Sequence, residues 1–215
     1  MLHIDPTDVL LVIDVQQDFC PGGALAVPEG DAVIGPIRSI ALLFDHIILT
    51  QDWHPANHIS FASSHPGKQN FDSIQLAYGR QVLWPSHCVQ GTPGANLHPA
   101  LDLTEAQLIL RKGFHPQIDS YSAFFENDRS TPTGLYGYLV ERGLKRVFLA
   151  GLAYDYCVGY SAIDARSLEI EAFVIQDACR AIDNNGSVAA IESDFAAAGV
   201  KLIATVELGI PTARL

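Results

Sequence analysis

The chain has 215 residues, of which 48% are hydrophobic and 17% are charged, so it can bury a core and is not a disordered chain. Acidic residues outnumber lysine and arginine by 24 to 13, which gives a formal net charge of -11. A field of this sign repels phosphate backbones and anionic lipids, so we expect no nucleic-acid partner and no membrane partner. The length predicts a single domain, 1–215, with a sizeable insertion.

Short apolar, β-branched runs alternate with stretches of helical spacing along the chain. The apolar runs predict strands over 9–15, 46–50, 108–112, 146–150, 170–176 and 200–204. The helical spacing predicts helices over 30–44, 133–142, 156–168 and 187–198. Ser187 is expected to cap the last helix, and Gly199 to end it. Repeated strand and helix predict an α/β fold, a three-layer α/β/α sandwich around a mostly parallel six-stranded, Rossmann-like sheet.

The segment from about 51 to 106 interrupts this alternation. It is rich in His, Pro, Gly, Asn and Ser and has no clear periodicity. A connection of this length is usually functional or contains short elements. We expect it to be an insertion that carries part of the functional site.

Cysteine usage and the N-terminus predict the compartment. The four cysteines, at positions 20, 88, 157 and 179, form no CxxC pair, which favours a reducing cytoplasm over a disulfide framework. The N-terminus has no basic region, and Asp14 interrupts its apolar run, so we expect no signal peptide. No window reaches the ~18 apolar residues that a membrane helix needs.

Ionisable residues lie at or just beyond the ends of four of the predicted strands: Asp14, Asp52 with His54, Lys112, and Cys157. Ligands of open parallel sheets bind beyond the carboxyl ends of the strands. If the strand order is 3-2-1-4-5-6, these four strands are neighbours. Their side chains would then converge at one edge of the sheet.

Two of these residues suggest nucleophilic chemistry. Cys157 stands at the start of a predicted helix, where free N–H groups, the helix dipole and a nearby Lys112 would lower its pKa. A free cysteine is equally often a small buried hydrophobic residue, so position alone leaves both interpretations open. Asp14 ends an apolar strand and is a candidate general base; the alternative is a turn aspartate that binds the next loop.

A second group has the residue types of a metal site. Asp52 and His54 form a D-x-H pair on one side of an extended segment, and His87 lies further along the insertion. One carboxylate and two imidazoles suit zinc, manganese or iron and leave open coordination positions. The spacing alone is a weak signal. His58 stays open as another ligand.

Five segments of the sequence, in this order, resemble the nicotinamidase/pyrazinamidase family of isochorismatase-like cysteine hydrolases: VIDVQQDFCPGGAL, TQDWHPANHISFA, LWPSHCVQGTPGA, RKGFHPQIDSYSAF and GLAYDYCV. The match extends through most of the chain. Any one of these motifs is weak, whereas five in the right order are highly specific. The resemblance implies the isochorismatase-like hydrolase fold.

The resemblance also implies roles for individual residues. It implies a catalytic triad of Asp14, Lys112 and Cys157. It implies one divalent metal ion, with zinc preferred over manganese or iron, on Asp52, His54 and His87. Whether a fourth protein ligand contributes, His58 or Ser60, is left open.

The same resemblance implies how the substrate is held. A cis peptide at Leu152–Ala153 would aim the amides of Ala153 and Cys157 into an oxyanion hole. An aromatic pocket would be formed by Phe19, Trp84 and Tyr121.

The implied reaction converts nicotinamide to nicotinate and ammonia through a cysteine thioester, with the metal orienting the pyridine ring; pyrazinamide is an expected second substrate. Homo-oligomerisation is left open. Three alternatives remain: a metal-independent cysteine amidohydrolase of carbamoyl or ureido substrates, an isochorismatase acting on a vinyl ether, and a non-catalytic metal or thiol module. The metal cluster argues against the first, Cys157 against the second, and the convergence of Asp14 and Lys112 against the third.

Overall fold

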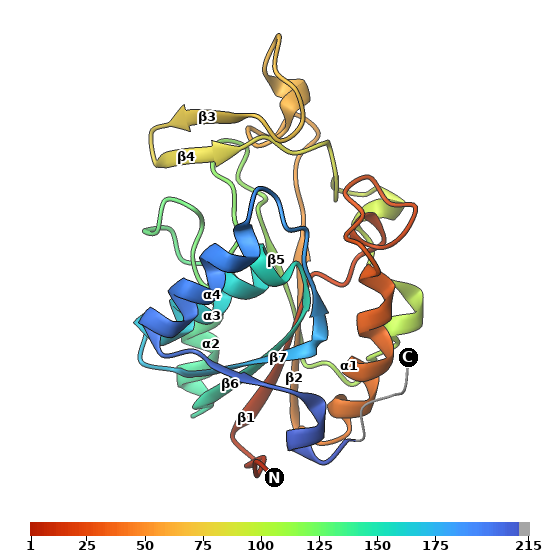
Figure 1. The fold of residues 1–215 in the computed structure, drawn as a ribbon, viewed down its shortest axis with the longest axis vertical. Helices are drawn as coiled ribbons and strands as arrows, with labels where there is room; N and C mark the ends of the chain where they lie inside the picture. Colours follow the sequence, from red (N-terminus) through yellow and green to blue (C-terminus); the bar gives the residue numbers. More distant parts are fainter. Residues whose placement is uncertain (211–215) are drawn as a thin grey trace.

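The computed structural model describes residues 1–210 and is built on a six-stranded sheet flanked by helices (Figure 1). Its strand order is β5-β2-β1-β6-β7-β8, and all pairs of neighbours are parallel. This confirms the predicted fold class and strand order. The strands are β1 (Asp8–Ile13), β2 (His46–Asp52), β5 (Leu108–Lys112), β6 (Arg146–Leu152), β7 (Glu171–Arg180) and β8 (Lys201–Ile203).

The helices form one layer on each face of the sheet. Helix α1 (Ile34–Ala41) covers one face, whereas α2 (Leu135–Glu141), α3 (Gly159–Ser167) and α4 (Ser187–Ala198) cover the other (Figure 1). Alternate residues of β1 serve the two layers: Leu10 and Val12 join the core on the α1 side, and Leu11 joins the core beneath α2, α3 and α4. Because β1 is buried on both faces, its sequence is apolar throughout rather than alternating.

Several element boundaries differ from the prediction. Strand β1 ends at Ile13, because Asp14 adopts a left-handed conformation with φ 47° and turns the chain. The predicted helix over 30–44 divides into a short 3-10 turn, Gly30–Val33, followed by α1.

The predicted cap of α4 is wrong in part. The residue before the helix is Gly186, at φ 80°, and the Ser187 hydroxyl donates to Asp155 Oδ2 instead of capping its own helix. Gly199 does end the helix, in a left-handed conformation at φ 73°.

The segment over 51–106 contains short elements that its sequence pattern did not reveal. They are an antiparallel hairpin, β3 (Ser73–Leu76) and β4 (Gly79–Val82), and 3-10 turns at Ala62–Ser64, Pro93–Ala95 and Pro99–Leu101. The hairpin projects beyond the sheet at the top of Figure 1. Isolated β-bridges tie the segment to itself and to the end of β1, at His54–Val89 and Gln16–Leu97. None of the helices in residues 1–210 is long and apolar enough to cross a membrane.

Candidate active site

The ends of β1, β2 and β5 bring three ionisable side chains together with a thiol. In the pairing of β2 with β5, Asp52 lies opposite Lys112, and β1 continues the sheet on the other side of β2. Lys112 Nζ lies 2.8 Å from Asp14 Oδ2 and 3.5 Å from Cys157 Sγ. The side chains of Lys112 and Asp14 are completely buried. We call Asp14, Lys112 and Cys157 the thiol centre.

Neighbouring groups fix each member of the thiol centre. The Thr50 hydroxyl donates to Asp14 Oδ1 at 2.5 Å and accepts from the Asp14 N–H at 3.1 Å. Lys112 Nζ also donates to the Ser120 carbonyl at 2.9 Å. Cys157 lies in a π-helical turn, Tyr154–Val158, that follows β6 and leads into α3. Backbone and side chains thus hold the carboxylate and the ammonium group in one orientation.

Burial dominates the ionisation of the thiol centre. It raises the pKa of Asp14, although the charge of Lys112 acts in the opposite direction. It also raises the pKa of the Cys157 thiol well above its usual range, again against Lys112. Lys112 does act to lower the pKa of Cys157, as expected, but burial of the thiol outweighs this charge in the free protein. A thiol beside a carboxylate of raised pKa forms a pair that can exchange one proton.

Beside the thiol centre lie Asp52, His54 and His87, which we call the histidine cluster. Their ligand atoms lie within 4.8 Å of one another. Asp52 Oδ2 is 3.4 Å from His54 Nε2 and 3.9 Å from His87 Nε2. Asp52 Oδ1 accepts from Lys112 Nζ, so this carboxylate connects the two groups.

The imidazoles of the histidine cluster are oriented as metal ligands. Nδ1 of His54 faces the Gly113 carbonyl at 2.7 Å, and Nδ1 of His87 faces the Pro85 carbonyl at 2.8 Å. These contacts place the proton on Nδ1 and leave the Nε2 lone pair free for a metal. His54 Nε2 is buried and has no hydrogen-bond partner within residues 1–210. Burial and the neighbouring His54 lower the pKa of His87 to about 4, so His87 is neutral at neutral pH. The cluster therefore fits a divalent ion.

His58 and Ser60, the residues left open as fourth ligands, bind each other. His58 Nδ1 lies 2.7 Å from Ser60 Oγ, and His58 Nε2 faces the carbonyls of His115 and Ile118 at 3.1 and 3.2 Å. The His58 ring packs against the His54 ring, with their centroids 4.3 Å apart. Both nitrogens of His58 are thus engaged within the protein.

Asp119 is a site residue that the sequence analysis missed. Its buried carboxylate lies within 4.8 Å of ring nitrogens of His54 and His58, and it accepts a hydrogen bond from Gln81 Nε2 at 2.8 Å. Asp119 lies in a loop seven residues after Lys112, inside the RKGFHPQIDSYSAF motif. That motif is the only sequence signal that could have identified it.

A cavity joins the thiol centre to the histidine cluster. The predicted aromatic residues Phe19, Trp84 and Tyr121 all line it, together with Ala153 and Cys157. Trp84 Nε1 donates to the Tyr121 hydroxyl at 3.2 Å, and the two rings meet edge to face. The Leu152–Ala153 peptide that precedes this wall is cis.

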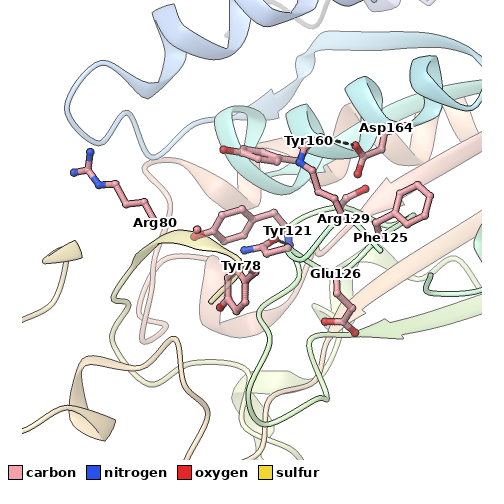
Figure 2. Close-up of a pocket in the computed structure, with 11 residues that line it drawn as sticks. Tyr78, Arg80, Tyr121, Phe125, Glu126, Arg129, Tyr160 and Asp164 are labelled. Carbon is pink, nitrogen blue, oxygen red and sulfur yellow. Dashed lines mark hydrogen bonds and ion pairs between the residues drawn. The ribbon is translucent and has the colours of Figure 1, made fainter. Parts of the chain in front are cut away.

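A second hollow, of about 200 Å³, lies on the other side of Tyr121. Figure 2 shows the Tyr121 ring between Tyr78 and Tyr160, with Arg129 paired to Asp164 at the rim. Tyr121 therefore forms a partition between the two cavities.

Glu126 also belongs to the second hollow, but its side chain points away from Tyr121 (Figure 2). Its Oε2 is buried and has no hydrogen-bond partner in the part of the chain that the structure describes. Burial and the charge of Asp119 raise the pKa of Glu126 to about 7. The charge of Lys112 acts in the opposite direction but, at this carboxyl, does not offset burial and Asp119.

The matching family model, the similar sequences and the similar solved structures agree with one another. The isochorismatase domain model matches residues 8–207. A nicotinamidase of Acinetobacter baylyi is 59% identical over 91% of this chain and 92% of its own. The solved nicotinamidase/pyrazinamidase of Acinetobacter baumanii superposes with a TM-score of 0.94 at 51% identity, covering 95% of this chain and 99% of its own.

Two other solved structures similar to this chain hold ligands. A protein of L. infantum in complex with nicotinate has a TM-score of 0.83 at 38% identity, over 95% of this chain and 96% of its own. A pyrazinamidase of Pyrococcus horikoshii in complex with zinc has a TM-score of 0.73 at 36% identity, over 93% of this chain and 99% of its own.

Proposed function

We propose a reaction for this chain, which belongs to the isochorismatase family: it is an amidohydrolase that converts nicotinamide into nicotinate and ammonia. The observation that carries the proposal is the contact of one buried ammonium group, Lys112 Nζ, with both the Asp14 carboxylate and the Cys157 thiol. This arrangement supplies a nucleophile, a base and a fixed positive charge within one cavity.

Asp14 and Cys157 carry the proton and the covalent bond. The thiol proton passes to Asp14 as sulfur attacks the amide carbon, and the C–N bond then breaks as Asp14 returns the proton to the departing ammonia. Water next attacks the thioester, giving its proton to Asp14, so that nicotinate leaves and the thiol re-forms. Lys112 keeps its charge throughout, because the carboxylates of Asp14 and Asp52 raise its pKa well above the usual range.

The histidine cluster would hold a divalent ion, for which zinc is our first choice. The support is the buried Nε2 of His54, which has no hydrogen-bond partner among the described residues, and the zinc in the Pyrococcus horikoshii pyrazinamidase. Bound there, the ion supplies a Lewis-acid position for the ring nitrogen of the substrate. In this interpretation, 51–106 is the metal-bearing insertion of a single domain.

The remaining cavity walls orient the substrate. Phe19 and Trp84 would sandwich the pyridine ring, with Tyr121 held against Trp84 by its hydrogen bond. The backbone amides of Ala153 and Cys157 would stabilise the oxyanion that forms when the thiol attacks. Pyrazinamide keeps a ring nitrogen in the same place and should also react.

The test compares three amides of similar shape. Purified protein is incubated with nicotinamide, pyrazinamide or benzamide, and released ammonia is measured. Nicotinamide and pyrazinamide should be hydrolysed, whereas benzamide, which lacks the ring nitrogen, should react far more slowly. Equal rates on benzamide and nicotinamide would support a metal-independent amidohydrolase instead. No ammonia from any of the three would refute the proposed reaction.

A further inference from the structure

The segment directly after β1 reaches across to the backbone of the histidine cluster. Gln16 is completely buried, and its amide pairs with Asp52 in both directions: Oε1 accepts from the Asp52 N–H at 2.8 Å, and Nε2 donates to the Asp52 carbonyl at 2.9 Å. The same Nε2 donates to the Ala95 carbonyl at 2.8 Å. The amide therefore fixes the peptide groups on either side of Asp52 and binds them to the far end of the insertion.

Asp18, two residues later, binds the backbone beside another member of the histidine cluster, His87. Its Oδ2 accepts from the Cys88 N–H at 2.7 Å, directly after His87, and its Oδ1 accepts from the Ala24 N–H at 3.2 Å. Cys88 has a left-handed backbone, at φ 46°, and its carbonyl accepts from the His54 N–H at 3.0 Å. The Asp18 carboxylate thus anchors Cys88, which follows His87 in the chain and is hydrogen-bonded to the backbone of His54.

A glycine of the insertion, Gly94, packs directly against the Asp18 carboxylate. A Cβ atom at position 94 would overlap the Asp18 carboxylate, so any larger residue there would push this side chain out of its present position. Asp18 is also charged and accepts two backbone N–H groups, and such charge-assisted bonds are stronger than neutral ones.

We propose that Gln16 and Asp18 are positioning residues that assemble the metal site from the end of the strand that also carries Asp14. This inference rests on the proposed function, because it assumes that Asp52, His54 and His87 bind a metal ion. Neither Gln16 nor Asp18 would touch the metal; each acts through the backbone beside a ligand. The short segment 16–18 follows Asp14 of the thiol centre in the chain. It would therefore help to form the histidine cluster from the same end of β1.

Two substitutions disrupt these contacts with little change in size. Gln16→Glu replaces a donor by a carboxylate oxygen that faces the carbonyls of Asp52 and Ala95, so the contact becomes repulsive. Asp18→Asn leaves a single acceptor oxygen for two N–H groups. Gln90→Glu is a matched control, because the exposed Gln90 also donates to a backbone carbonyl next to Asp52, that of Trp53, at 2.9 Å.

The experiment titrates the metal-stripped full-length protein with Co²⁺ and records both its affinity, by chelator competition, and its visible absorption spectrum. Gln16→Glu and Asp18→Asn should each bind Co²⁺ about 10- to 100-fold more weakly, as do substitutions that disturb the support of a metal ligand. Their Co²⁺ bands should shift, because the ligand geometry changes. Gln90→Glu should match the wild type, and alkylation of Cys157 should keep its wild-type rate in Gln90→Glu and in Asp18→Asn, whose contacts lie on the His87 side of the cluster.

The outcomes separate this inference from the proposed function. Wild-type affinity and spectrum in both Gln16→Glu and Asp18→Asn would overturn the positioning roles while leaving the metal site in place. Failure of the wild-type protein itself to bind Co²⁺ would overturn the metal site and the positioning roles together. Should Gln16→Glu fail to fold, Asp18→Asn decides the question, since its change is the milder one.

Discussion

The thiol centre and the histidine cluster adjoin each other but are held by different means. Members of the thiol centre follow regular strands, and strand pairing sets where each side chain emerges. The histidine cluster lies mostly on the insertion, and backbone carbonyls orient its two rings: that of Pro85 within the insertion and that of Gly113 directly after β5. A parallel sheet therefore places the reacting groups, whereas individual hydrogen bonds shape the site that would hold the metal.

Removal of the nucleophile tests the thiol centre most severely. Cys157→Ala should lower nicotinamide turnover by more than about 10⁴-fold, because no other group can form the thioester. The protein should still fold and still bind metal, since the histidine cluster is intact. Cys179→Ala is the control: that buried thiol, whose pKa burial raises to about 12, should leave most activity. Ammonia release measures both variants, and substantial turnover by Cys157→Ala would exclude the covalent mechanism.

Loss of the base should have the next largest effect. Asp14→Asn keeps the size of the side chain but removes proton transfer, so kcat should fall by about 10²- to 10⁴-fold with a smaller change in KM. Steady-state kinetics with nicotinamide measures this split. Asp45→Asn, an exposed aspartate just before β2, should behave like the wild type. A large rise in KM at unchanged kcat would instead make Asp14 a binding residue.

A substitution in the histidine cluster should affect metal binding but not the reactivity of the thiol centre. His87→Ala should lower metal affinity and reduce nicotinamide hydrolysis by about 100-fold or more, because it removes a direct ligand. The alkylation rate of Cys157 should change little. His98→Ala, on the same insertion but outside the cluster, provides the control. If His87→Ala kept full activity in verified metal-free protein, the ion would have no part in holding the substrate.

A smaller effect is expected where the two regions touch, at the contact between Gly113 and the His54 ring. Gly113 follows Lys112 at φ 64°, and a Cβ there would lie 2.5 Å from the His54 ring. Gly113→Ala should therefore destabilise the protein by about 1 to 3 kcal/mol and weaken metal binding. Gly67→Ala, also left-handed but with nothing within 4 Å, measures backbone strain alone. Chemical denaturation of both variants gives the difference, and equal losses would show that the contact with His54 costs nothing.

The smallest effect comes from Glu126, a carboxyl that, unlike Asp14, forms no ion pair with Lys112 within residues 1–210. The pKa of Glu126 is raised from 4.5 to about 7 by burial and by Asp119, so the folded state holds its proton more tightly than the unfolded state. This stabilisation is complete below pH 4.5 and is lost as pH rises to about 7. Glu126→Gln has no group that titrates at this position, so the variant should not lose this stability as the pH rises.

The stability difference between Glu126→Gln and the wild type should thus grow in favour of the variant from pH 4.5 to 7 and stay constant above. We expect about 1 to 2 kcal/mol, because solvent partly screens the group. Urea denaturation at several pH values measures the difference. Glu141→Gln, an exposed glutamate at the end of α2, should show no such trend. A pH-independent difference would mean that Glu126 titrates normally.

The strand pattern predicted more of the thiol centre than of the histidine cluster's surroundings. Asp14 and Lys112 could be placed because each ends an apolar run, and parallel strands end at one edge of a sheet. Asp119 could not, because it lies in a loop whose path depends on contacts distant in sequence, such as the one with Gln81. The interaction of Ser187 with Asp155 was missed for the same reason.

The sequence by itself determined the fold class and the set of residues that could react, because these depend on periodicity and on residue chemistry; the strand order was an assumption that the structure bears out. Only the tertiary structure decided the ionisation of Cys157, since burial outweighs the local effects of a helix start and a lysine. It alone also decided how Gln16 and Asp18 bind the backbone beside Asp52 and His87. Desolvation and long-range hydrogen bonds arise only when distant segments pack together, so no local pattern of residues reveals them.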